Sequence, residues 1–245
     1  MESDSGCPDW DIDELTIKSR DFDRATDTES LECALEFLRN AMPAPIHRTA
    51  IPARICFLLA DRTCNNNSRR EQFASEGVRW AEIAINEGAG LNGAVHYYLG
   101  MNLGLAVYEH TALAVKNLKR IASALRKSCQ LAPDFDRGGP LRVLGMLYLM
   151  APPWPQGIGD GDKAIELLEA VTKRHPAHPR NHIFYARALW EIEEEDALDQ
   201  VKQQLLEAQK LLNQGGGKWG SAKQVWLDEI KEIADDAEIE LAPAP

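Results

Sequence analysis

Three histidines fall close together in the stretch HPAHPRNH, at His175, His178 and His182. Imidazole nitrogen is a common zinc ligand, so this cluster could hold a metal in an enzyme accessory subunit. Two of the histidines precede prolines in a turn, however, and no cysteine or carboxylate lies at a fixed spacing from them. The pattern is more typical of a turn between two helices, and we therefore expect no metal and no other cofactor.

A glycine-rich stretch, APPWPQGIGDGDKA at 151–164, is the second candidate for chemistry. A phosphate-binding loop needs Ser or Thr directly after its lysine, whereas Lys163 is followed by alanine. A calcium loop needs oxygen ligands at places where this stretch continues with Ile and Leu. We expect instead a long turn in which Asp160 or Asp162 caps the next helix. Trp154 is expected to pack down on neighbouring helices, where it could act as a lid beside a groove.

Motifs of nucleophilic enzymes are missing from the sequence, which contains no GxSxG, no HExxH and no cysteine with a placed histidine. The acidic run at 191–196 has the composition of a solvated helix end. We therefore predict no catalytic residues and a non-enzymatic function.

The composition limits the partners of this chain. Its 245 residues are 44% hydrophobic, enough to bury a core in one large domain or two small ones. A formal net charge of −11 argues against nucleic acid as a partner, because such binding needs a basic face. No apolar run approaches the ~18–20 residues that a membrane-spanning helix needs.

The five cysteines form no CxxC pair. Cys33, Cys56 and Cys129 lie in apolar helical patterns, where a thiol usually packs as a small core residue. A Cys56–Cys64 disulfide could form in an oxidising compartment. Cys7 follows Ser-Gly, like a lipid-bearing cysteine, but the apolar stretch of such a signal does not precede it. As the sequence stands, the protein is predicted to be cytoplasmic; if the native N-terminus was trimmed, it is periplasmic and could be lipid-anchored.

Helical periodicity runs through most of the chain, and no strand-like alternation occurs. The sequence predicts an all-α domain over 26–236, between a polar tail at 1–25 and a C-terminal tail at 237–245. The expected helices cover 30–42, 53–62, 69–88, 93–110, 112–133, 140–152, 162–176, 180–195, 197–213 and 221–241.

Pairs of these helices repeat. The strings LGMNL, LGMLY and YARAL place the small residues Gly100, Gly145 and Ala186 at equivalent positions of three successive helices. The helices that follow the first two of these end at Pro133 and Pro176. Each unit is therefore a helix with a small residue, a loop, an amphipathic helix and a proline. The small residue is predicted to let the second helix approach the first closely.

This pattern resembles the tetratricopeptide repeat. Its motif positions are met by Leu144, Gly145, Tyr148, Ala164, Leu168 and Pro176. The standard repeat has ~34 residues, whereas the unit here is longer because of the PPWPQGIGDG insertion. The resemblance implies an α-solenoid of four to five helical hairpins with elongated repeats.

A closer resemblance is to the T-component family of TRAP-type (tripartite, ATP-independent periplasmic) transporters. It covers roughly residues 70–215 and is strongest over 138–189. The family consists of helical-repeat lipoproteins that associate with a periplasmic solute-binding protein and can trimerise around an apolar channel. The regulator of microtubule dynamics family is a more distant relative with similar repeats.

In stacked helical pairs the first helices line the concave face. Stepping along these helices from the repeat leucine predicts a groove lined by Tyr97, Met101, Arg142, Met146, Leu149, Ile183, Arg187 and Trp190. Aromatic residues, Met and Arg often anchor interfaces, and the two arginines could hold a carboxylate together. The alternative is that several of these side chains belong to the core between repeats, above all Met146 and Leu149.

The predicted function is that of a non-catalytic scaffold. It would bind a partner protein, such as the solute-binding protein of a TRAP-type transporter, or an apolar or carboxylate ligand in its groove. A homo-oligomer, by family resemblance a trimer, is compatible with this interpretation. The alternatives are a cytoplasmic assembly adaptor and a metal-binding enzyme accessory subunit that uses the three histidines.

Overall fold

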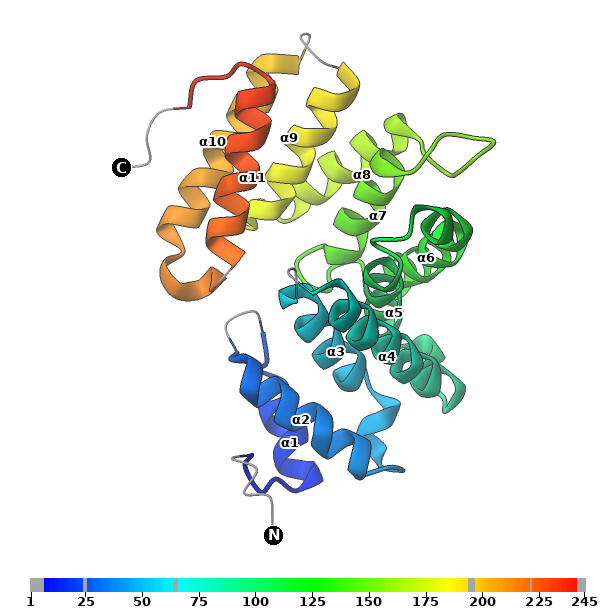
Figure 1. Ribbon diagram of the computed structural model, residues 1–245. Helices are drawn as coiled ribbons and strands as arrows, with labels where there is room; N and C mark the ends of the chain where they lie inside the picture. Colours follow the sequence, from blue (N-terminus) through cyan, green and yellow to red (C-terminus); the bar gives the residue numbers. More distant parts are fainter. Residues whose placement is uncertain (1–6, 24–25, 64–65, 194–196, 221, 242–245) are drawn as a thin grey trace. The chain divides into compact units, whose positions relative to one another are not determined.

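The computed structural model describes residues 7–23, 26–63, 66–193, 197–220 and 222–241. These residues form α-helices joined by turns and short 3₁₀ segments, and none of them belongs to an extended strand, so the all-α class is confirmed. The chain divides into two compact units, residues 1–132 and 133–245 (Figure 1). The sequence prediction of one domain over 26–236 rests on helical periodicity, which continues on both sides of Pro133 and carries no information on how the chain divides into units.

The first unit contains six α-helices and the second contains five, within the described part of the chain. Those of the first unit are α1 (Ile12–Lys18), α2 (Thr28–Asn40), α3 (Ile51–Arg62), α4 (Asn67–Asn86), α5 (Gly93–Ala106) and α6 (Thr111–Leu131). Those of the second are α7 (Gly139–Met150), α8 (Gly161–Arg174), α9 (Pro179–Glu193), α10 (Leu198–Gln214) and α11 (Ala222–Asp236). All ten helices expected from periodicity are present.

Several helices begin at a side chain that replaces the missing backbone acceptor. Asp27 accepts from the Ser30 amide at 2.7 Å and starts α2, and Asn66 does the same for α4. Asp160 accepts from the Lys163 amide at 3.1 Å and starts α8. The sequence left this role open between two aspartates, and the structure assigns it to Asp160. Such caps satisfy amides that have no partner within the helix.

Glycines bring the paired helices together in both units. A methyl group added at Gly100 of α5 would lie 2.8 Å from the Leu125 side chain of α6. One added at Gly145 of α7 would lie 2.7 Å from Leu168 of α8. The close approach predicted from the small residues is therefore confirmed, because no larger side chain fits without moving the partner leucine.

Some helices that are two apart in the chain also pack directly on each other. In the first unit α3 contacts α5, and in the second α7 contacts α9 and α9 contacts α11. The apolar core of the second unit is built from facing sides of α8, α9, α10 and α11, with Met146 of α7 and Trp219 of the turn before α11.

Several polar contacts join residues that are 37–40 apart in the chain, whereas Arg187 and Glu232, which link α9 to α11, are 45 apart. In the first unit the pairs are Glu32–Arg69, Arg39–Glu76, Arg48–Glu87, Arg70–Glu109 and Glu82–Arg120. In the second unit they are Asp134–Arg174 and Arg142–Asn181. The contacts of Glu32, Arg39, Glu82 and Arg142 link helices two apart in the chain, whereas Arg48–Glu87 and Asp134–Arg174 join the two ends of one helical pair.

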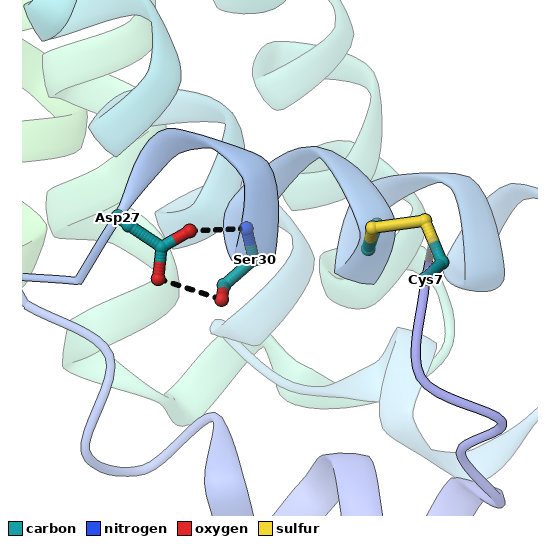
Figure 2. The surroundings of a disulfide bond; sticks show 4 residues. Cys7, Asp27 and Ser30 are labelled. Atoms are coloured by element: carbon teal, nitrogen blue, oxygen red, sulfur yellow. Dashed lines mark hydrogen bonds between the residues drawn. A yellow bond between two sulfur atoms is a disulfide. The ribbon is translucent and has the colours of Figure 1, made fainter. Parts of the chain in front are cut away.

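The expected N-terminal tail is partly structured. Residues 12–18 form α1, and Trp10, Leu15 and Phe22 are buried. A disulfide joins Cys7 to Cys33 of α2, near the cap formed by Asp27 (Figure 2). The sequence missed this pairing because residues 1–25 show no helical periodicity. The predicted Cys56–Cys64 pair is not described, because Cys64 lies outside the described residues, and Cys56 is a buried thiol.

The C-terminal tail expected from 237 onwards also continues the core. Ala237 is buried, and Ile239 and Leu241 pack against the apolar cluster of the second unit. The sequence predicts a helix over 221–241 that includes residues 237–241, whereas α11 ends at Asp236 and the residues after it pack on the core without helical structure.

Candidate interaction site

The eight residues of the predicted groove lie on α5, α7 and α9, and burial separates them into two groups. Four are buried inside their own unit: Tyr97, Arg142, Met146 and Ile183. The other four keep part of their surface exposed: Met101, Leu149, Arg187 and Trp190. The alternative of a core between helices therefore describes the first group, and it holds in part for Leu149 and Trp190, which pack against the apolar core of the second unit while some of their surface stays exposed.

Arg142 is only 4% exposed and is fully engaged within its unit. Its guanidinium donates to the Asn181 side chain and to the Asp136 carboxylate, each at 2.8 Å. It also lies within hydrogen-bond reach of the backbone carbonyls of Asp136 and Arg137. Arg142 thus ties the turn before α7 to the start of α9. This corrects the prediction that its guanidinium is presented to a ligand, since a buried charge requires such internal partners.

Arg187 remains at the surface of the second unit, on α9. Its guanidinium lies 3.1 Å from Glu232 of α11 and 3.6 Å from Glu191. Partial burial opposes its charge, but the hydrogen bond to Glu232 and the charges of Glu229, Glu232 and Glu191 leave the pKa of Arg187 raised. A carboxylate ligand at Arg187 would have to displace acids of the protein itself.

The three histidines of the predicted metal cluster have separate neighbours. His175 contacts Asp134 at 2.9 Å, His182 contacts Gln204 and the Pro176 carbonyl, and His178 lies against the rings of Trp219 and Trp226. Their side chains are thus used to join the turn between α8 and α9 to the rest of the second unit. Over the described ranges, no three His, Cys, Asp or Glu side chains are grouped as a metal site requires.

An open depression of about 590 Å³ lies along α4 in the first unit. Its lining is one outward stripe of that helix: Ser68, Glu71, Gln72, Ser75, Glu76 and Arg79. Glu76 is paired with Arg39, and Glu71 lies 3.5 Å from His110. The depression is therefore a polar surface between ion pairs, with no enclosed apolar part to hold a small ligand.

Trp154 differs most from its prediction. The expected packing against neighbouring helices is wrong, because its residue surface is 83% exposed. The α7–α8 connection that carries it projects away from both helices (Figure 1). Near the loop, the sequence did not single out two further exposed apolar residues, Met150 (73% exposed) and Ile192 (42%). Both residues lie in the last turn of a helix, where an apolar residue falls outside the face that the helix buries. An apolar residue at such a position is the sequence signal from which their exposure could have been predicted.

Comparison with protein-family models gives no match to this chain, and comparison with curated proteins gives none. Within the described ranges, no helix combines the length and the apolar character that crossing a bilayer requires.

Proposed function

We propose that this protein is a non-catalytic scaffold of tetratricopeptide-like helical hairpins, an α-solenoid with elongated repeats, that binds a partner protein. The observation that carries this proposal is the repetition of one packing scheme. The Gly100–Leu125 contact of α5 and α6 recurs as Gly145–Leu168 in α7 and α8. Polar contacts between residues 37–39 apart then link α2 to α4, α4 to α6 and α7 to α9. Stacked hairpins of this kind generally act through extended surfaces rather than through an enclosed active site.

The surface proposed for the partner is that of the odd-numbered helices. These helices pack directly on one another, whereas the Arg39–Glu76 and Glu82–Arg120 links between even-numbered helices are made by long side chains. Shorter separation on the odd-numbered side would make this side concave. In the second unit this surface presents Arg187, together with Leu149 and Trp190, which keep part of their surface exposed while packing against the apolar core; the first unit by itself presents Met101 on α5.

The proposed partner, by the resemblance of residues 138–189, is the solute-binding protein of a TRAP-type transporter. The Cys7–Cys33 disulfide supports an oxidising compartment such as the periplasm, because such bonds are rare in the cytosol. A cytoplasmic adaptor role has no comparable support. A ligand of apolar or carboxylate character on the same surface would involve Arg187 and Trp190.

The test is a calorimetric titration of the purified chain with TRAP-type solute-binding proteins of the source organism. Trp190→Ala and Arg187→Glu are expected to weaken the affinity about tenfold or more, because Trp and Arg are the residues that most often carry interface energy. Lys202→Glu, a charge reversal at an exposed site on α10, is the matched control. Equal affinities for all three variants and the unchanged protein would contradict the proposal.

A further inference from the structure

The loop between α7 and α8 is closed at its base by its own backbone. The Gly157 amide donates to the Pro153 carbonyl at 3.1 Å, and the Gly159 amide donates to the Pro152 carbonyl at 2.8 Å. The Asp160 amide then donates to the Tyr148 carbonyl at 3.0 Å, which fixes the loop to the end of α7. These bonds hold the segment as a closed turn with Trp154 near its tip.

The glycines and prolines of the loop are the residue types that its closed backbone conformation requires. A side chain at Gly157 would meet the Pro152 carbonyl oxygen at 2.3 Å, and one at Gly159 would meet the Ala151 carbonyl oxygen at 2.1 Å. Both obstacles are backbone atoms, which cannot move without opening the turn. Prolines at 152, 153 and 155 further restrict the chain. The loop is therefore pre-organised, and binding through it would cost little conformational entropy.

Trp154 presents a large apolar surface outside the fold. A buried tryptophan removes about 150–250 Å² from water, and here most of that surface stays in water. Met150 at the end of α7 adds a second exposed apolar side chain, and Ile192 lies against Gly161 at the start of α8. Apolar residues thus gather around the base and the tip of one rigid loop.

The charges around this apolar group are mainly negative. Asp160 is paired with Lys163, so the only nearby lysine of α8 is already engaged at the base of the loop. Asp162 and Glu166 on α8 are exposed carboxylates, and Glu191 beside Ile192 is also exposed but lies 3.6 Å from the Arg187 guanidinium. Residues 133–245 also carry most of the excess of acidic over basic side chains in the chain.

We infer that the Trp154 loop is a docking element that inserts into an apolar pocket rimmed by lysine or arginine on a protein partner. The inference rests on the proposed scaffold function, to which it adds a second contact surface and the chemistry of the partner's pocket. Tryptophan in a rigid setting is the commonest energetic centre of an interface, and the surrounding acids require a basic rim. A membrane surface fits less well, because anionic headgroups would repel Asp162, Glu166 and Glu191.

Site-specific photocrosslinking first identifies what the loop touches. Benzoylphenylalanine replaces Trp154 in the full chain, and in a second preparation it replaces Val225, an exposed apolar residue of α11 in the same unit. Both are irradiated in cells of the source organism. The expected result is a protein adduct at 154 that does not form at 225. Absence of such an adduct overturns the inference, and so does an adduct to a second copy of this chain or within one chain.

The captured protein is then purified and titrated with the unmodified chain. Trp154→Ala is expected to weaken binding about 30-fold and Trp154→Phe much less. Asp162→Lys is expected to slow association, and added salt should reduce the difference between it and the unchanged protein. Equal affinity of Trp154→Ala, or Trp154-dependent binding to vesicles of phosphatidylcholine and phosphatidylglycerol, overturns the inference.

Two variants separate this inference from the proposed function. If Trp190→Ala and Arg187→Glu abolish partner binding while Trp154→Ala does not, the scaffold proposal stands and the docking loop is rejected. If Trp154→Ala alone weakens binding, the docking loop stands, and the surface of the odd-numbered helices is not the contact.

Discussion

The helix pairs α5–α6 and α7–α8 make the same contact but are connected differently. In each, a glycine of the first helix lies under a leucine of the second, Gly100 under Leu125 and Gly145 under Leu168. The first pair is joined by the short turn at 107–110 and the second by the long loop at 151–160. Side-chain packing along the helices therefore determines how the two helices of a pair contact each other. The length and sequence of the connection can vary without changing this contact.

The two units also differ in the interactions that fasten their first residues to the helices that follow. The first unit contains all five cysteines and fastens its N-terminal segment to α2 through Cys7–Cys33. The second has no cysteine and fastens the turn before α7 through Arg142, Asp136 and Asn181. The start of the first unit is fastened by a covalent bond that reductants can break, whereas the start of the second unit is fastened by hydrogen bonds and burial.

The largest expected effect comes from removing the covalent link. The disulfide joins residues 26 apart, and its loss through Cys33→Ser is expected to reduce the stability of the first unit by about 3 kcal/mol, because the unfolded segment gains freedom. Hydrogen exchange should rise in α1 and α2 and stay unchanged in α7–α11.

Cys129→Ser is the matched control, since Cys129 is a free thiol in the same unit. Burial raises the pKa of the Cys129 thiol to about 11, so alkylating reagents at pH 8 should modify it slowly and should not disturb the comparison. Equal hydrogen exchange in α1 before and after reduction would show that packing alone stabilises this segment and that the disulfide adds no stability.

A smaller effect, similar in both units, is expected from the glycines. Gly100→Val and Gly145→Val should each lower the free energy of unfolding by about 2 kcal/mol, because the new side chain overlaps the facing leucine. Urea denaturation measures both. Gly104→Val on α5 is the control, since an added Cβ there meets nothing within 4 Å. If the Gly145 variant alone were tolerated, the long loop would be relieving strain that the short turn cannot.

The smallest effect concerns two helix caps that differ in their response to pH. Asn66 caps α4 and does not titrate, whereas Asp160 caps α8 with a carboxylate. The side chain of Lys163 and then its amide hold the pKa of Asp160 below the usual 3.8. Since the folded pKa is lowered, its contribution is present above about pH 4 and is lost as pH falls through the folded pKa.

Hydrogen exchange in the first turn of α8 should therefore rise at low pH, relative to the first turn of α4. Asp160→Asn keeps a cap and should remove this dependence on pH. The cap assignment would be undermined if the Asn variant kept the same pH profile as the unchanged protein.

Features that depend on a few neighbouring residues were mostly predictable from the sequence, although the short helix α1 was missed. Periodicity located the ten helices, Asp160 was one of two expected caps, and Gly100 and Gly145 marked the close contacts. These features depend on neighbours within about one or two turns, or on the absence of a side chain, so the local pattern contains them.

The tertiary structure alone decided the rest. It buried Arg142, paired Cys7 with Cys33, separated the three histidines and left Trp154 in solvent. Each of these depends on where the turns and helix ends of a unit come together in space. An arginine or a tryptophan has the same local pattern whether its neighbours in the fold enclose it or leave it exposed. The sequence by itself therefore determined the helices and their pairing, and the fold determined which of their side chains a partner can reach.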